Sequence, residues 1–413
     1  MHYIDLFAGA GGLSEGFIKA GFEPVAHVEM DRAACYTIKT RLAYHHLKKA
    51  KQTSKYVDYL RGKIDRDALY ATLPKGVHDS VINATISATT LPSIFERVDA
   101  LTRGKKVDVI IGGPPCQAYS LVGRARDANG MKNDARNYLY KHYASFLKRY
   151  QPKVFVFENV LGLRTAAKGM YLADMKECFD NAGYHIADDL LNARDFGVLQ
   201  NRKRILIVGW HKDLGIEGMP DFDRGSWKYS VADLLSDLPS LGAGEGQIKN
   251  GRYRRKTTAY LKKSALRNGI DVLTQHFTRP QSKQDLKIYS VAVKRWDNGK
   301  ERLRYTDLPS TLRTHKNTTS FLDRFKVVAA NEHYSHTVVA HISKDGHHYI
   351  HPDLEQNRSL SVREAARLQS FPDDYYFEGV KADTPRTAAF KQIGNAVPPM
   401  MAAAIARAIK ARL

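Results

Sequence analysis

Hydrophobic and polar positions at the start of the chain predict a strand, a helix and a second strand in close succession. Residues 2–7, HYIDLF, predict a buried strand that leads into the glycine-rich segment AGAGG. LSEGFIKAG follows with apolar residues at helical spacing and with Gly21 at its end. FEPVAHVEMD, at 22–31, predicts a second strand that ends in the acids Glu29 and Asp31. This order is typical of a parallel βαβ unit.

The alternation resumes after a mostly polar stretch at 33–105, which contains helical segments such as ACYTIKTRLAYHHLKKAK. VDVIIGG at 107–113 predicts a strand, YLYKHYASFLKRY a helix, and KVFVFENV at 153–160 another strand. YLADMKECFDNAG predicts a helix that ends at Gly183, and YHIADDLLNA and RILIVGW predict a pair of strands. Up to about residue 210 we therefore expect an α/β fold with a doubly wound, mostly parallel sheet.

Beyond residue 210 the pattern loses this regularity. HKDLGIEGMPDFDRGSW and LPSLGAGEGQIKNG are rich in Gly, Pro and Asp, which is typical of loops and of a crossing between domains. Residues 270–350 contain short β-like pieces, HTVVAHIS and HHYI, and no long helical period. Helical spacing returns in SVREAARLQSF at 361–371 and in PPMMAAAIARAIKARL at the end. A chain of 413 residues exceeds the usual size of one hydrophobic core, so two domains are expected.

Composition indicates a folded protein, because 43% of the residues are hydrophobic and 26% are charged. No apolar run approaches the roughly 18 residues that span a bilayer, and the first residues do not resemble a signal peptide. Cys35, Cys116 and Cys178 are odd in number and far apart, which argues against a disulfide framework or a zinc site. We therefore expect no metal, no membrane partner and a reducing, intracellular compartment.

The charge balance points to a polyanionic partner. Lys and Arg number 64 against 43 Asp and Glu, a net charge of +21. This excess favours a nucleic acid, although a merely basic protein is the alternative. Residues 249–269 carry eight Lys or Arg and no acid. Tyr253 and Tyr260 are interleaved there, which favours a surface that follows phosphates over a merely solvated face. The candidate contacts are Arg252, Arg254 and Arg255.

The segment DLFAGAGGLSEGF is the first candidate site. Glycines between a strand and a helix let a ligand approach the backbone and the helix N-terminus closely, although a tight connection is the bland alternative. Glu29 and Asp31 end the next strand, where ribose hydroxyls are usually held. The helix has no phosphate-binding lysine, and the glycine spacing is not G-x-G-x-x-G. The site therefore suits a nucleoside with a zwitterionic tail better than a pyrophosphate.

Cys116 in IIGGPPCQAYS is the second candidate. A lone cysteine is usually a small buried hydrophobe. Here residues 112–115, two glycines and two prolines, bring the backbone out at the carboxyl end of a strand, where open α/β sheets bind ligands. Polar Gln117 and Ser120 follow. Cys116 is thus a candidate nucleophile, a role that requires the thiolate.

Charged residues at two further strand ends complete the set. Glu158 ends the apolar strand VFVFENV, where a carboxyl group is costly unless it is paired or functional. Glu158 could serve as a proton donor or form a salt bridge with a neighbouring arginine, and the two interpretations are equally good. Arg202 and Arg204 in QNRKR alternate before ILIVGW and should face one side. Such a fork could orient a carboxylate, stabilise a thiolate or bind phosphate.

Together these segments closely resemble the DNA (cytosine-5)-methyltransferases that use S-adenosylmethionine. DLFAGAGG resembles the first cofactor motif of that family, GGPPCQAYS its nucleophile loop, ENV its acid motif and QNRKR its Gln-x-Arg-x-Arg motif. RSLSVREAARLQSFPDDY and QIGNAVPPMMAAAIA resemble the two C-terminal motifs. The resemblance implies a class I methyltransferase fold, Rossmann-like, and methyl transfer to C5 of a cytosine.

The same resemblance implies the chemical roles. Cys116 would add to C6 of the cytosine while Glu158 protonates N3, which makes C5 a nucleophile. Arg202 and Arg204 would hold the base and Glu158. The base lies inside a duplex, so it would be flipped out at a cost of a few kcal/mol. Gln117 and Ser120 would lie on the loop that closes over DNA.

The resemblance also implies a cofactor pocket in which Glu29 binds the ribose and Met30 lies against adenine. Asn395 would reach across from the last helix. The other expected lining residues are Phe7, Ala8, Gly9, Gly11, Gly12, Leu13, Asp31, Pro115, Leu139, Ala396 and Val397. The aspartate that the family usually places near adenine has no clear counterpart, because neither Asn83 nor Asp99 fits convincingly.

The implied organisation is a discontinuous catalytic domain, residues 1–210 plus 385–413, because the last helix returns beside the first strand. Residues 211–384 would form a smaller, β-containing target-recognition domain and hinge. The 33–105 stretch is longer than a minimal member of the family needs and has no assigned role.

We expect a sequence-specific enzyme that modifies double-stranded DNA, the partner of a restriction endonuclease with which it forms no stable complex. It would act as a monomer on DNA in the bacterial cytoplasm. A tRNA-directed enzyme is one alternative, although the basic region and PPCQAYS favour DNA. A catalytically inactive DNA-binding regulator is the other, although the four candidate catalytic residues are all intact.

Overall fold

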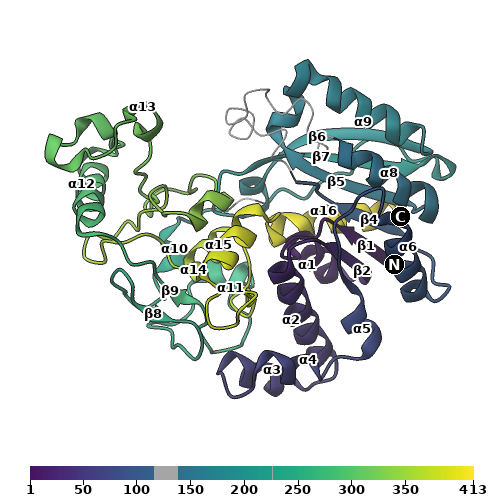
Figure 1. Ribbon diagram of the computed structural model, residues 1–413, viewed down its shortest axis with the longest axis horizontal. Helices are drawn as coiled ribbons and strands as arrows, with labels where there is room; N and C mark the ends of the chain where they lie inside the picture. Colours follow the sequence, from purple (N-terminus) through teal and green to yellow (C-terminus); the bar gives the residue numbers. More distant parts are fainter. Residues whose placement is uncertain (116–137, 226) are drawn as a thin grey trace.

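A seven-stranded sheet forms the centre of the first domain. The computed structural model describes residues 1–115, 138–225 and 227–413. The strands are ordered β3-β2-β1-β4-β5-β7-β6 (Figure 1). Their bounds are β1 His2–Leu6, β2 Glu23–Glu29, β3 Val81–Asn83, β4 Val109–Gly112, β5 Val154–Val160, β6 Tyr184–Asn192 and β7 Lys203–His211. The first five in spatial order are parallel, and β7 is antiparallel to both β5 and β6.

Helices cover both faces of the sheet, as expected for a doubly wound fold. One layer contains α1 (Gly12–Lys19) and α16 (Pro399–Arg412), and the other contains α6 (Leu91–Thr102), α8 (Leu139–Tyr150) and α9 (Met170–Asp180). Successive side chains on a strand point to opposite layers. Ile110 thus packs in the core beneath α6, α8 and α9, whereas Ile111 packs in the core beneath α1 and α16.

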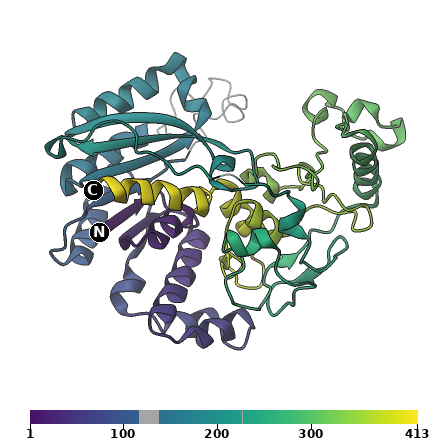
Figure 2. The ribbon, with the colours of Figure 1, turned by 180° about the vertical axis from the view of Figure 1, so that it is seen from behind.

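The two ends of the described chain meet in one layer. A Cβ atom on Gly16 of α1 would lie 2.4 Å from the Cβ of Ala402 in α16, so the two helices are in close contact. Figure 2 shows α16, in yellow, beside the N-terminal elements. The predicted return of the last helix to the first domain is therefore observed, and the strands and helices expected before residue 210 are present.

The stretch at 33–105 folds mainly into helices. These are α2 (Arg32–Lys49), α3 (Thr53–Leu60), α4 (Arg66–Tyr70) and α5 (Lys75–Asp79), followed by β3 and α6. An aromatic cluster joins α2 and α3 to the C-terminal part of the chain, because Tyr44, Tyr56 and Tyr59 pack with Tyr376. The insertion thus supports the segment that follows α14 (Val362–Leu368).

Much of the chain between residues 231 and 396 forms a second region with its own apolar core. That core includes α10 (Ala232–Leu235), α11 (Ala259–Lys263), α14 and α15 (Arg386–Asn395). The β structure described here is small, because β8 (Gly246–Gln247) and β9 (His276–Phe277) pair over two residues each.

A lobe built on α12 (Lys283–Gly299) and α13 (Thr318–Phe321) stands apart from this core (Figure 1). The expectation that residues 270–350 contain no long helix is wrong. The side chain of Ser282 accepts a hydrogen bond from Asp285 N and caps α12, whose apolar residues pack inside the lobe.

The expected strand HTVVAHIS is also absent, since its second half is a 3₁₀ helix, Ala340–Ser343. The physical reason is that the main-chain groups of Val338 bond to side chains and not to a neighbouring strand. Its N donates to Gln200, and its O accepts from Arg202. Among the described residues, no helix is long and apolar enough to cross a bilayer.

Candidate active site at the carboxyl edge of the sheet

The predicted site residues gather where the parallel strands end. Glu29 and Asn83 end β2 and β3, which are neighbours in the sheet. Gly113 follows β4, and Glu158 lies near the end of β5. Because β7 runs in the opposite direction, its first residues lie at the same edge, and Arg204 pairs with Val160. One edge thus holds the glycine loop, the acid and one arginine.

The glycine loop is folded onto β2 by main-chain and carboxylate contacts. Ala8 N donates to Val28 O at 3.2 Å, and Gly9 N donates to the Glu29 carboxylate at 2.8 Å. Phe7, Gly9 and Gly11 all have positive φ angles, of 58°, 54° and 76°. A Cβ atom on Gly9 would meet nothing within 4 Å, so the loop leaves open space at this point. Such a loop can admit a ligand close to the backbone.

Gly12 allows the segment after α15 to close against the start of α1. A Cβ atom on Gly12 would lie 2.3 Å from Val397 O and 3.3 Å from the Cβ of Ala396. Leu13 and Val397 are buried in the core beneath α16. Asn395 is exposed and ends α15, so the expectation that it lies on the last helix is wrong. The chain bends at 396–398 before α16 begins.

Glu29 is held by two main-chain amides. Its carboxylate accepts from Gly9 N at 2.8 Å and from Asp31 N at 2.7 Å. Burial raises the pKa of Glu29 above its ordinary value, although the hydrogen bonds from Asp31 and Gly9 act in the opposite direction. The carboxylate is therefore fixed in direction at the mouth of the glycine loop.

Asp31 has a different environment. Its side chain caps α2 through Ala33 N and Ala34 N and forms an ion pair of 3.0 Å with Lys391. Burial acts to raise the pKa of Asp31, but the hydrogen bond and charge of Lys391 outweigh it and the pKa is lowered. These contacts give Asp31 a structural task besides any contact with a ligand.

Asn83 and Asp99, the two weak candidates for the adenine contact, lie in different places. The amide of Asn83 donates to the carbonyls of Glu29 and Met30, each at 3.0 Å, at the carboxyl edge. Met30 is 61% exposed beside it. Asp99 lies on α6 and binds Arg149 and Tyr150 of α8. Of the two, Asn83 lies at this edge and Asp99 does not, and the position of Asn83 at the end of the short run VIN was the available signal.

Glu158 and Arg204 form an ion pair across neighbouring strands. Arg204 Nε lies 2.7 Å from Glu158 Oε1, and both side chains are nearly buried. A Cβ atom on Gly113 would lie 2.7 Å from Glu158 Oε2, so only glycine leaves room for the acid here. Gly113 leads into Pro114 and the half-buried Pro115. The acid therefore lies against the segment that leads to Cys116.

Arg202 does not share this arrangement. It is fully buried, and its guanidinium donates to Val338 O at 2.7 Å, to Ala396 O at 2.9 Å and to Gly394 O at 3.2 Å. The expectation that Arg202 and Arg204 face one side is wrong, because β7 begins at Lys203 and strand alternation does not extend to Arg202. Arg202 N donates instead to the side chain of Asn192.

Two buried glutamines reinforce the same joint. Gln200 binds Leu368 O and the side chain of Gln369, each at 2.9 Å, and accepts from Val338 N. Gln369 donates to Ile393 O at 2.7 Å. These glutamines and Arg202 tie the start of β7 to the end of α15. The sequence pattern did not single out Gln200 or Gln369, although Gln200 opens the motif QNRKR.

Three predicted residues, Cys116, Gln117 and Ser120, lie outside the described residues. Leu139, at the first position of α8, is half-buried.

Comparison with known proteins decides the family. The model of the C-5 cytosine-specific DNA methylases matches residues 1–74 and 93–411. The chain belongs to this family. The predicted enzyme class, a DNA cytosine-5 methyltransferase, is confirmed.

Curated relatives match this methyltransferase along almost its entire length. Type II methyltransferase M.Bpa9945I of Bacillus paralicheniformis is 42% identical and covers 99% of this chain and 98% of its own. Type II methyltransferase M1.HphI of Haemophilus parahaemolyticus is 34% identical and covers 98% of this chain and 86% of its own. The predicted resemblance is therefore confirmed.

Solved structures confirm the predicted fold class. A prophage-encoded E. coli protein described as a DNA modification methyltransferase has a TM-score of 0.62 at 22% identity. It covers 100% of this chain and 99% of its own. Entamoeba histolytica methyltransferase EhMeth has a TM-score of 0.57 at 13% identity and covers 99% and 97%.

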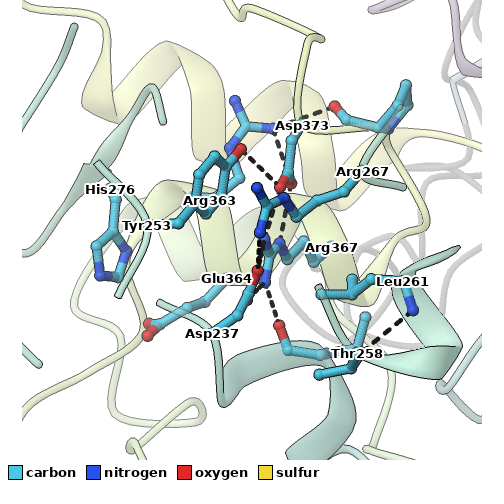
Figure 3. A network of polar contacts seen from close by, with 12 residues as sticks. Asp237, Tyr253, Thr258, Leu261, Arg267, His276, Arg363, Glu364, Arg367 and Asp373 are labelled. Atoms are coloured by element: carbon cyan, nitrogen blue, oxygen red, sulfur yellow. Dashed lines mark hydrogen bonds and ion pairs between the residues drawn. The ribbon is translucent and has the colours of Figure 1, made fainter. Parts of the chain in front are cut away.

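The basic segment at 249–269 of the methyltransferase is anchored by its tyrosines. Tyr253 donates to Asp373 at 2.9 Å (Figure 3). Tyr260 is buried and donates to Gly197 O. The expectation that these rings line a surface that follows phosphates is therefore wrong. The physical reason is that the buried Arg367 binds both Asp373 and Asp237, and this charged network draws Tyr253 inward.

The arginines of the segment remain on the surface. Arg252, Arg254 and Arg255 are exposed. Arg254 N donates to Asp237 O at 2.9 Å, so the main chain of the segment is fixed to the same network.

Proposed function

We propose that this methyltransferase transfers the methyl group of S-adenosylmethionine to C5 of a cytosine in double-stranded DNA, as the modification enzyme of a type II restriction system. The observation that carries the proposal is the Glu158–Arg204 pair beside Gly113, because it sets an acid with a directed carboxyl group against the segment that leads to Cys116. The type II assignment follows the names of the relatives.

The chain's own residues account for the activation of the base. The Cys116 thiolate forms a bond to C6 of the flipped cytosine while Glu158 gives a proton to N3. The C5–C6 electron pair thereby becomes available at C5, which takes the methyl group. Loss of the C5 proton to water then returns the C6–S electron pair to sulfur, and N3 gives its proton back to Glu158. The double bond and the thiolate are both restored.

Arg204 orients the acid in this proposal. Its Nε donates to one oxygen of Glu158 and leaves the other oxygen, beside Gly113, for N3 of the base. A charge-assisted bond at 2.7 Å fixes the carboxyl group in a narrow range of directions.

The glycine loop fits S-adenosylmethionine. The open space beside Gly9 admits a ligand to the backbone, and Glu29 offers a fixed carboxylate for ribose hydroxyls. Met30 and Asn83 lie together beyond Glu29, where an adenine ring would be held. When bound, S-adenosylmethionine supplies an electron-poor methyl group on a sulfonium.

Further residues belong to the cofactor pocket in this proposal. The loop and the segment after α15 supply Phe7, Ala8, Gly11, Gly12, Leu13, Asn395, Ala396 and Val397, and Asp31, Pro115 and Leu139 complete the set.

We assign Arg202 a positioning role in place of contact with the base. Its guanidinium donates hydrogen bonds to three carbonyl groups. Two of them belong to Gly394 and Ala396, on either side of Asn395. Arg202 would therefore fix the loop that closes the cofactor pocket at Gly12.

Contacts with DNA complete the proposal. Gln117 and Ser120 would act beside the flipped base, and the exposed Arg252, Arg254 and Arg255 would meet phosphates. The enzyme would work as a monomer in the bacterial cytoplasm, without a stable complex with the restriction endonuclease.

One experiment tests the reaction and the substrate together. Purified enzyme is incubated with S-adenosylmethionine and a mixture of duplex DNA and tRNA, and 5-methylcytosine is mapped by bisulfite sequencing. We expect 5-methylcytosine in DNA within one short sequence and none with Cys116→Ala. Product on tRNA alone, or product made by Cys116→Ala, would overturn the proposal.

A further inference from the structure

The lobe formed by residues 283–326, which we call the α12–α13 lobe, is strongly basic and exposed. It contains eleven Lys or Arg and five Asp or Glu. Its own apolar core, which includes Tyr289, Leu303, Tyr305 and Phe325, holds it together. Figures 1 and 2 show α12 and α13 at the far end of the molecule from the N-terminus.

Most acids of the lobe are engaged by nearby cations or helix caps. Asp307 and Glu301 both pair with Arg295, and Asp323 pairs with Lys326 at 2.6 Å. Asp285 belongs to the N-terminal cap of α12. The positive charge that these acids leave uncompensated is therefore concentrated on other side chains of the lobe.

Arg313 and Lys316 carry part of this uncompensated charge. Both are exposed, and within the described chain neither forms an ion pair. They belong to the segment RTHKNTT, residues 313–319, in which every residue is exposed. We call this segment, whose last two residues begin α13, the 313–319 loop.

The 313–319 loop is fixed to the lobe at its start. Gln284 on α12 donates to Leu312 O and to the hydroxyl of Thr314, each at 3.0 Å. His315 N donates to the hydroxyl of the buried Tyr305 at 2.9 Å. A loop that is already ordered pays little conformational entropy when it binds.

A ring contact fixes the far side of the loop. The imidazole of His315 stacks on Phe321, with ring centroids 3.6 Å apart and an interplanar angle of 18°. Phe321 in turn packs against Tyr305 of the lobe core. Arg313 and Lys316 are thus presented from a backbone that is tied down on both sides.

The chain that leaves the lobe runs directly to the active-site edge. Asn201 N donates to Ser335 O at 2.9 Å, and Thr337 donates to Asn201 O at 2.6 Å. Val338 N donates to Gln200. Residues 335–338 therefore join the lobe to the start of β7, next to Arg204.

We infer that the 313–319 loop docks on the sugar–phosphate backbone of the duplex whose cytosine enters the active site, with Arg313 and Lys316 each contacting a phosphate. This inference rests on the proposed function, since DNA is the polyanion. Hydroxyl groups of Thr314, Thr318 and Thr319 flank the two cations, and this mixture of side chains is typical of phosphate contacts. Lysine acts there as a point charge that reads no base.

The test compares two double variants with the same loss of charge. Arg313→Gln/Lys316→Gln alters the loop, and Lys55→Gln/Arg61→Gln alters two exposed residues of the α3 region as the matched control. Binding to a fluorescein-labelled duplex that contains the methylated sequence is measured by anisotropy, without S-adenosylmethionine, over a range of salt concentrations. The slope of log affinity against log salt should be less steep for the loop variant by about 1.8, which is about 0.9 for each phosphate contact that is lost.

Loss of the two phosphate contacts should lower the affinity of the loop variant about 60-fold at 0.1 M salt. The control variant should bind almost as the wild type does. Arg313→Lys should keep most of the slope, because it keeps the charge. Equal slopes for loop variant and control would overturn the inference. A changed methylation sequence for the loop variant in bisulfite maps would also overturn the inference, because it would indicate that the loop reads bases. Since binding is measured without methyl transfer, it is independent of the test of the proposed reaction.

Discussion

Arg204 Nε lies 2.7 Å from Glu158 Oε1, and the two residues come from adjacent antiparallel strands. If this pair orients the acid toward N3, Arg204→Ala should lower kcat/KM by about 10- to 150-fold, the effect of a charge-assisted hydrogen bond worth about 1.5–3 kcal/mol. Tritium transfer to DNA measures the rate, and calorimetry with S-adenosylmethionine should give an unchanged Kd. An unchanged rate would remove Arg204 from the mechanism.

Gly113 provides a steric test of the same acid. A Cβ atom here would lie 2.7 Å from Glu158 Oε2, so Gly113→Ala must push the carboxyl group aside. We expect methyl transfer to fall by about 100-fold, as for a displacement of about 1 Å at a reacting group. Gly76→Ala is the control, since its Cβ would meet only Arg103, at 3.6 Å. Equal activity of both variants would show that the position of Glu158 is unimportant.

The role of Arg202 can be read from the kinetic parameter that changes. If Arg202 positions residues 394–396, the Arg202→Met variant should have a KM for S-adenosylmethionine that is raised about tenfold or more, with little change in kcat. Gln369→Leu removes a second support of the same loop, the bond to Ile393 O, and should act in the same way. Thermal denaturation controls for folding. A loss confined to kcat, with the KM unchanged, would instead support contact with the base.

Asn83 should contribute to adenine binding. Asn83→Ala removes the amide that lies against Glu29 O and Met30 O, and the KM for S-adenosylmethionine should rise by about 2- to 12-fold, as for one hydrogen bond. Asp99→Ala serves as the control, because Asp99 binds Arg149 and Tyr150 away from the edge. If Asp99→Ala raised the KM and Asn83→Ala did not, the assignment would be reversed.

Stability should fall in mild acid because of His27. The residue is fully buried with its Nε2 on Ser14, and burial lowers its pKa to about 4. The unfolded chain therefore takes up this proton first as pH falls below about 6.5, so stability decreases between pH 6.5 and 4. His27→Gln should make the Tm less dependent on pH in this window, as measured by scanning fluorimetry. A pH dependence identical to that of the wild type would contradict the prediction.

Most of the first domain could be predicted from the sequence because its strands are apolar runs that end in glycine or acid. The periods of 2 and 3.6 residues were clear there, and the carboxyl ends of β1, β2, β4 and β5 then had to share an edge. The positions of Glu29 and Glu158 follow from this rule alone.

The second region was less predictable because its side chains obey no simple period. The helix α12 was missed since its buried residues, among them Ile288, Tyr289 and Val293, meet only the small core of the lobe. Arg202 and Tyr253 were misplaced for another reason. Their partners, Ala396 and Asp373, are more than a hundred residues away along the chain.

The contact of Gly12 with Val397 also makes the site depend on two parts of the chain that lie far apart in the sequence. The glycine loop follows β1, and the facing wall follows α15, so neither part can form the pocket by itself. A fragment that carries β1 to β7 without the segment after α15 would therefore lack one wall of the site.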